Sequence, residues 1–257
     1  MHYKISRMWP YLHHQLYPAG YLISKFNSIF DSFGYGIKFI ILSPENCRRT
    51  KLYFKPKLYI VNLPFIFNRI INLIFSPVSE WGKINTENHN KTSIVNQFAL
   101  PLIIIMSLCT IVGNAIFASR LIFSIQFVIA VAMAKFIEAF IGLHISAKMV
   151  NELTTSFNSK KDIHLTYALV VYSLSVYFAV SALAYLFLGS YLEILKVFGL
   201  YSFYLLWLGA TALLSTPADN KVGFVVVSAL VILGVFSILT LVIDKIIAGI
   251  FHIQAVS

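Results

Sequence analysis

Long apolar runs separated by short polar segments fill the chain from about residue 92 to the C-terminus. Lys91 is followed by 28 residues without a charged side chain. A helix needs about 20 apolar residues to cross a hydrocarbon core of roughly 30 Å. The runs reach that length and lack the strict alternation of lipid-facing barrel strands, so they predict transmembrane helices. We expect five crossings, at residues 97–118, from 121 past 145, 165–188, 193–214 and 222–243.

Short polar segments predict the connections between these crossings. Ser119-Arg120 predicts a tight turn, residues 148–162 a polar loop, and Gly189-Ser190 a helix end. Residues 215–221 form a second polar loop by composition, and Asp244-Lys245 is expected to end the last crossing. Pro101 stands in the opening turn of the first crossing, where its missing N–H costs least.

Residues 64–84, upstream of the first crossing, predict an amphipathic helix followed by a shorter one. The apolar positions recur at helical spacing and are Phe67, Ile70, Ile71, Ile74 and Phe75. Ser76-Pro77 is expected to end the first helix and start the second. We expect both helices on the cytoplasmic membrane face, with Trp81 at headgroup level and Arg69 and Lys83 towards phosphates. The alternative is an ordinary pair of helices packed under the bundle.

Composition supports a membrane protein and places most of its positive charge near the N-terminus. Of the 257 residues, 58% are apolar and 12% charged, and the mean hydropathy is +0.79, which is unlike a soluble domain. Residues 1–96 hold 12 Lys/Arg against four acidic residues, whereas the remaining 161 hold eight against six. A basic segment beside membrane spans favours anionic lipid headgroups over nucleic acid as its partner. We therefore expect the lipid bilayer as partner and no nucleic acid.

Positive charge near the ends of the crossings also predicts their orientation. Lys148, Lys160, Lys161 and Lys221 fall on the side of the basic N-terminus, and Arg120 and Lys245 fall on the other side. Because cytoplasmic loops are enriched in Lys and Arg, we expect the N-terminus in the cytoplasm and the C-terminus outside.

The N-terminal 60 residues differ from the rest. They are basic, aromatic and interrupted by prolines, their longest apolar run, 37–42, is too short to span, and they do not resemble a signal peptide. We expect a poorly ordered extension at 1–60, cytoplasmic amphipathic helices at 61–96, a five-helix transmembrane domain at 97–250 and a tail at 251–257.

Lys135 and Glu138 are the sharpest candidates for intramembrane chemistry. Three residues apart on a helix, they can pair, and charges inside a membrane are functional hypotheses by default. Counting from Leu121 places them nearer the cytoplasmic leaflet, which favours a structural ion pair over an ion relay. His144, with Asn114 and Gln126, is a candidate extension of this polar interior.

The chain contains no recognisable enzyme, cofactor or metal motif. A Walker loop, a dinucleotide fingerprint, a His-Glu-x-x-His sequence and a nucleophile elbow are all lacking, and the seven histidines are dispersed except for one adjacent pair. We expect no catalytic residue, no bound cofactor and no metal site.

Short segments in two regions of the chain carry a resemblance to a known family. Pro64-Phe65 to Arg69, Ser76 to Trp81, and Ala99 to Leu102 resemble the opening of bacterial members of the Yip family, Ypt/Rab-interacting membrane proteins. Tyr204 to Gly209 and Thr216 to Phe224 resemble the last helical pair of that family. The resemblance covers about residues 64–246 and implies an all-α, polytopic bundle of five transmembrane helices after cytoplasmic amphipathic helices.

The resemblance implies a non-enzymatic protein that organises, scaffolds or shapes a bacterial cytoplasmic membrane, alone or with another copy or a membrane-protein partner. The acidic Asp-Leu-Tyr-Gly-Pro-like motif of eukaryotic members has no counterpart in the sequence, so Rab binding is not carried over. Residues 1–60 have no place in the bacterial pattern, which favours a native start near Val61 as one alternative. A small transporter component using Lys135 and Glu138 is the alternative function.

Overall fold

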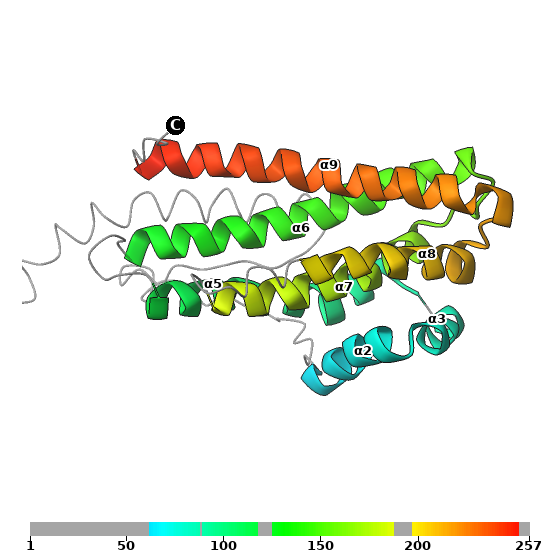
Figure 1. Cartoon of the computed structure of the whole chain (residues 1–257), viewed down its shortest axis with the longest axis horizontal. Coiled ribbons are helices and arrows are strands. Elements are labelled where there is room, and N and C mark those ends of the chain that lie inside the picture. Colours follow the sequence, from blue (N-terminus) through cyan, green and yellow to red (C-terminus); the bar gives the residue numbers. More distant parts are fainter. Residues whose placement is uncertain (1–61, 88, 118–124, 188–196, 252–257) are drawn as a thin grey trace, which may run out of the picture. The chain divides into compact units, whose positions relative to one another are not determined.

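The computed structural model describes residues 62–87, 89–117, 125–187 and 197–251, all within one compact unit at residues 58–257. The N-terminal 60 residues, the expected turn at 119–120 and the helix end at 189–190 lie outside the described residues. The described part is helical and contains no strand (Figure 1). Its elements are α2 (Leu63–Phe75), α3 (Pro77–Thr86), α4 (Lys91–Ile94), η2 (Val95–Ala99), α5 (Leu100–Phe117), α6 (Ile125–Ser156), α7 (Ile163–Leu186), α8 (Tyr201–Leu214) and α9 (Ala218–Phe251).

Five helices in the described part of the chain are long and apolar enough to cross a membrane, which confirms the predicted polytopic helical fold. Their bounds differ from the prediction where polar residues continue a helix. The first crossing begins at Lys91, α6 continues to Ser156, and α9 runs past Asp244-Lys245 to Phe251. The backbone N–H and C=O groups of polar residues form helical hydrogen bonds as those of apolar residues do. A polar side chain therefore does not by itself end a helix.

Pro101 lies inside the first crossing rather than in its opening turn. The helix starts with α4, where the Asn90 side chain accepts a hydrogen bond from the Thr92 backbone N–H. It passes through the π-helical segment η2, which ends at Ala99, two residues before Pro101. A proline in a helix interior removes one i→i−4 hydrogen bond and crowds the preceding turn, and a π-helical turn is one way to accommodate it.

Helix α7 lies at the centre of the transmembrane bundle. In its most apolar 18-residue window, 67% of residues are buried, against 11% for α9. Helix α5 runs parallel to α7: the Lys91 N–H bonds His164 Nδ1 at one end, and the backbone of Tyr185 lies against Gly113 at the other. A Cβ atom at Gly113 would lie 1.9 Å from the Tyr185 carbonyl oxygen, so glycine is required for this close approach.

Helices α6 and α9 run antiparallel and side by side (Figure 1). Three contacts fix their register: the Phe157 and Phe224 rings at one end, Glu138 and Thr240 further along, and the Phe127 and Phe251 rings at the other end. Helix α9 therefore packs mainly on α6 and leaves most of its apolar surface exposed, which suits a lipid-facing helix.

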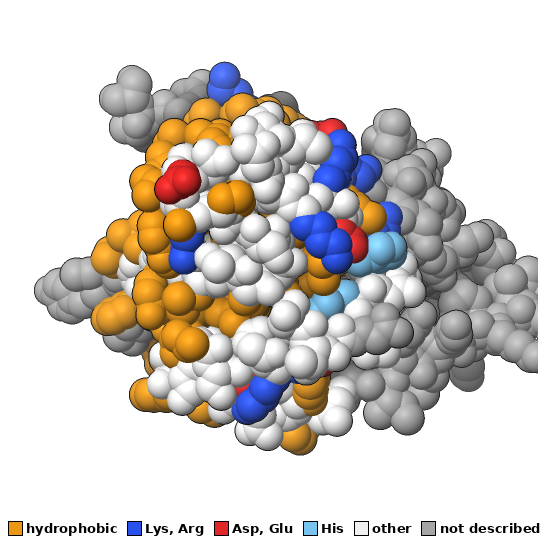
Figure 2. Space-filling model, turned by 90° about the vertical axis from the view of Figure 1, so that its right-hand side faces the viewer, with side chains coloured by type: hydrophobic (Ala, Val, Ile, Leu, Met, Phe, Trp, Pro, Cys, Tyr) orange, Lys and Arg blue, Asp and Glu red, His pale blue; other side chains and the backbone are white. Residues whose placement is uncertain are grey.

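The loop between α6 and α7 and the turn between α8 and α9 meet at one end of the bundle. The Lys160 N–H donates to the Leu214 carbonyl, and the Ser159 hydroxyl lies 2.9 Å from that of Thr216. Figure 2 looks onto this end, where Lys, His and acidic side chains gather beside an apolar margin. Lys160 and Lys161 both belong to it, as the charge pattern predicts for one side of the bundle.

Candidate functional site

Helix α2 has apolar side chains on both its buried and its exposed surface. Ile66, Ile70 and Leu73 are buried on one face, together with Arg69. The rest of the helix surface exposes six large apolar side chains, of which Phe75 is 80% exposed; the others are Leu63, Phe65, Phe67, Ile71 and Ile74. The predicted amphipathic helix therefore exists, but its buried face packs on the protein and its exposed face is itself apolar.

Arg69 sits in a buried ion network rather than facing headgroups. Its Nη1 donates to Glu80 Oε1 at 2.7 Å, and its Nη2 donates to Glu87. The side chains of Arg69 and Glu80 are 6% and 4% exposed. The second oxygen of Glu80 accepts from Lys83, whose side chain is 62% exposed. The expectation that Arg69 points towards phosphates is therefore wrong, because its two terminal guanidinium nitrogens donate to two carboxylates of the protein.

Aromatic rings complete the enclosure of Arg69. The guanidinium carbon lies 5.0 Å from the centre of the Phe65 ring and 5.4 Å from that of Tyr172 on α7. Burial alone would lower the pKa of the Arg69 guanidinium, but the hydrogen bond to Glu87 and the nearby negative charges outweigh it and raise that pKa. Arg69 is therefore a permanent cation that ties α2 to α3 and α7.

Trp81 is a core residue and does not reach a headgroup layer. Its side chain on α3 is 1% exposed, and its ring meets Tyr172 edge-on at 6.4 Å. Gly209 on α8 makes room for it, since a Cβ atom there would lie 2.7 Å from the indole and 2.5 Å from Leu169. The prediction for Trp81 is wrong because α3 turns this ring into the bundle; the alternative of packing against the bundle holds for α3.

A hydroxyl from α8 fixes the C-terminal end of α2. Tyr201 Oη donates to the carbonyl oxygens of Leu73 and Ile74, at 3.2 and 3.1 Å. The last carbonyls of a helix lack partners within the helix, so this contact satisfies groups that would otherwise need water. At the other end, the Asn62 side chain accepts from the Phe65 N–H. Both ends of α2 are capped by side chains.

The intramembrane pair predicted on α6 forms. Lys135 Nζ and Glu138 Oε2 are 2.8 Å apart, and their side chains are 20% and 10% exposed. The other carboxylate oxygen of Glu138 accepts from the Thr240 hydroxyl on α9 at 2.7 Å. Glu138 therefore binds both a neighbour on its own helix and a second helix, which fits a structural role.

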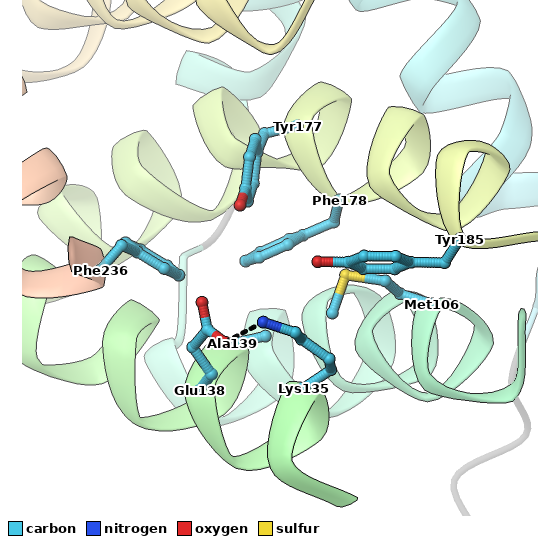
Figure 3. A pocket seen from close by; sticks show the side chains of 8 residues that line it. All are labelled: Met106, Lys135, Glu138, Ala139, Tyr177, Phe178, Tyr185 and Phe236. Atoms are coloured by element: carbon cyan, nitrogen blue, oxygen red, sulfur yellow. Dashed lines mark hydrogen bonds and ion pairs between the residues drawn. The ribbon is translucent and has the colours of Figure 1, made fainter. Parts of the chain in front are cut away.

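A small cavity adjoins the pair (Figure 3). It has a volume of about 10 Å³, which is roughly room for one water molecule. Besides the pair, it is lined by Met106, Ala139, Tyr177, Phe178, Tyr185 and Phe236. The lining is mostly apolar or aromatic, so among the described residues this cavity offers no wide aqueous path to the pair.

The pair lies at a different depth from the one predicted. Its neighbour Tyr177 is 14 residues beyond the start of α7 at Ile163, or about 21 Å along that helix. The pair therefore lies in the half of the bundle away from the Lys160 and Lys161 loop. The count from Leu121 misplaced it because α6 extends to Ser156, well past the end assumed for a crossing.

The other predicted polar residues do not join the pair. His144 is 1% exposed, and one ring nitrogen lies 2.8 Å from the Phe140 carbonyl of its own helix. The Asn114 side chain likewise donates to the Thr110 carbonyl on its own helix. Gln126 is exposed. No group of three or more potential metal ligands is found in the described part of the chain.

These features define a polytopic helical integral membrane protein with a surface helix fixed to its bundle. The Yip1 domain matches residues 71–241, about two-thirds of the chain. The chain therefore belongs to the Yip1-domain family, as the sequence resemblance predicts. No curated protein and no solved structure matches at a significant level.

Proposed function

We propose that this Yip1-family protein organises or shapes the bilayer without enzymatic chemistry, and that α2 is the element that does so. The observation that carries the proposal is an exposed apolar face on a helix whose other face and both ends are fixed. A rigidly held apolar face can enter one leaflet as a wedge, because the helix does not yield when lipid presses against it.

The energetics favour insertion of this face. Full burial of a large apolar side chain contributes about 1.5–3 kcal/mol, and Phe67 and Phe75 are 58% and 80% exposed. The exposed Lys83 ammonium on the neighbouring helix suits phosphate groups of anionic lipids. Its positive charge, with the exposed Lys160 and Lys161, favours the cytoplasmic leaflet of a bacterial membrane for this end of the protein.

Reconstitution into liposomes tests the wedge. The triple variant Phe67→Ser, Ile71→Ser, Phe75→Ser removes exposed apolar groups without touching the Arg69 network, so it should fold and lose most membrane deformation in a tubulation assay. Asn68→Ser on the same helix is the matched control and should deform vesicles like the wild type, since Asn68 is exposed and polar. Unchanged tubulation by the triple variant at equal protein density would refute the proposal.

The transporter alternative draws on the Lys135 and Glu138 pair and has less support. Both charges have partners, and the adjoining cavity holds roughly one water molecule. Scaffolding by a closely packed bundle requires no such path. Homo-oligomerisation or a membrane-protein partner is compatible with the wedge and would multiply its effect; cross-linking in native membranes tests it, with a purely monomeric band at every lipid ratio as the contrary result.

A native start near Val61 is compatible with this function, because α2 begins at Leu63. Mass spectrometry of the native protein tests this start. Peptides covering Arg7 to Lys51 would exclude it.

A further inference from the structure

A groove separate from the α2 face lies between α6 and α9. Its volume is about 180 Å³, and its walls are apolar except for one cation and one anion. The lining residues are Phe127, Val131, Ala134, Lys135, Asp244, Ile247 and Ala248. The groove lies on the same helices as the intramembrane pair, because Lys135 reaches both it and the small cavity of Figure 3.

Contacts between the two helices explain why a hollow remains between them. The Glu138 bond to Thr240 joins the helices on one side of the groove, and the rings of Phe127 and Phe251 meet at 5.2 Å towards the other. Between these contacts, Ala134 and Ala248 have side chains too short to fill the space. The hollow is therefore part of the helix packing.

The two charged residues of the groove, Lys135 and Asp244, do not pair with each other. Lys135 Nζ donates to Glu138, which leaves two of the three protons of an ammonium group for other acceptors. Among the described residues, no ion pair joins Lys135 to Asp244, and Asp244 is exposed and has no hydrogen-bond or ion-pair partner. The groove thus presents a donor cation and an acceptor anion at separate points of one apolar trough.

The position along the bundle suits a lipid headgroup. Asp244 directly follows 22 charge-free residues, 222–243, of the most apolar helix. A run of that length spans the hydrocarbon core, so the groove lies where the core meets the headgroup layer, on the side of the bundle away from the Lys160 and Lys161 loop.

We infer that this groove binds a zwitterionic phospholipid with a primary amine, of the phosphatidylethanolamine type. Its phosphate accepts from the Lys135 ammonium, and its amine donates to the Asp244 carboxylate, which can only accept. A choline headgroup has no N–H to donate, and a purely anionic headgroup is repelled by Asp244. The volume is below the roughly 300–1,000 Å³ of sites that enclose whole ligands, as expected if the acyl chains remain largely in the bilayer.

Native mass spectrometry of the full-length protein tests the inference. The protein is equilibrated in nanodiscs of equimolar phosphatidylethanolamine, phosphatidylcholine and phosphatidylglycerol, and retained lipids are counted after release. The wild type should retain phosphatidylethanolamine about tenfold over phosphatidylcholine, the ratio expected of one charge-assisted hydrogen bond. Asp244→Asn should weaken the preference several-fold, because the amide oxygen accepts the amine N–H without the negative charge that strengthens the bond. Ala248→Phe should reduce retention by filling the groove without changing charge.

Asp219→Asn is the matched control, because Asp219 is an exposed acidic residue near the opposite end of the same helix. This variant should retain the wild-type preference. Each of the following results would overturn the inference: equal retention of the three lipids by the wild type, preferential retention of phosphatidylglycerol, an undiminished phosphatidylethanolamine preference in Asp244→Asn, or undiminished retention of phosphatidylethanolamine in Ala248→Phe. None of these depends on whether α2 deforms membranes.

Discussion

The ion pairs of Arg69 and Lys135 differ in burial, and the pair outside the transmembrane helices is the more buried one. Arg69 lies outside the transmembrane helices, yet its side chain is 6% exposed and joins carboxylates 11 and 18 residues away. Lys135 lies within a transmembrane helix, yet its side chain is 20% exposed and pairs within one helical turn. Burial of a charge here follows tertiary contacts more than depth in the membrane. The Arg69 network should therefore bear more of the stability.

Arg69→Met should have the largest effect. It leaves Glu80 buried without its strongest partner, and breaking a buried ion pair costs about 3–5 kcal/mol. We expect a sharply lower melting temperature in detergent and proteolysis within α2. Lys83→Met removes the exposed partner of the same carboxylate and should cost at most about 1 kcal/mol. Similar losses in the two variants would contradict the comparison.

Gly209→Ala should cause the second-largest loss of stability, because the added methyl group pushes α3 away from α8. The new methyl group would overlap the Trp81 indole and Leu169, and overpacking of this kind costs about 1–3 kcal/mol. Gly234→Ala on α9 is the matched control, since nothing lies within 4 Å of the position that its new Cβ atom would take. Thermal unfolding should separate the two variants, and equal melting temperatures would argue against a close α3–α8 contact.

Glu138→Gln should have a smaller effect than Arg69→Met. The amide still accepts from Thr240, and Lys135 can extend towards polar surroundings, so we expect a loss of about 1–2 kcal/mol. Glu152→Gln, at a 70% exposed position on the same helix, should be close to neutral. Ion flux through reconstituted vesicles should be the same for Glu138→Gln and wild type. A flux in the wild type that the variant abolishes would support the transporter alternative.

Tyr201→Phe should have the smallest effect. It removes the hydroxyl that donates to the last carbonyls of α2, at a cost of about 0.5–1.5 kcal/mol. Hydrogen exchange should quicken in the last turn of α2 and little elsewhere. Tyr204→Phe, at a 46% exposed position on the same helix, is the control. Equal exchange in both variants would show that the hydroxyl does not hold α2.

The transmembrane helices were predictable from the sequence, but several of their ends were not. Length and lack of charge identify a crossing because lipid offers no partner for free backbone groups. By the same criterion a helix would end at the first charged residue. In the structure, α9 continues through Asp244-Lys245 and α6 continues past Lys148. Helix hydrogen bonding does not depend on side-chain polarity, so hydropathy locates the membrane core better than the helix ends.

The candidate site was predictable only where partners are close in sequence. Lys135 and Glu138 pair as their three-residue spacing predicts. Arg69 was misassigned because its partners Glu80 and Glu87 are brought to it by the turn at Ser76. Tyr201 and Thr240 bind positions more than 100 residues away. No local pattern marks such residues, although the Glu80-Trp81 pair was one part of the family resemblance.

The central place of α7 has a consequence for biosynthesis. The ribosome completes the first two crossings before α7 exists, yet α7 is the parallel neighbour of the first crossing and contacts it at Lys91 and at Gly113. The first two crossings thus enter the membrane before the helix that packs closely on Gly113 has been made. Arrest of translation just before residue 163 should leave α5 and α6 accessible to chaperones and proteases in the membrane, and synthesis of α7 should close that interval.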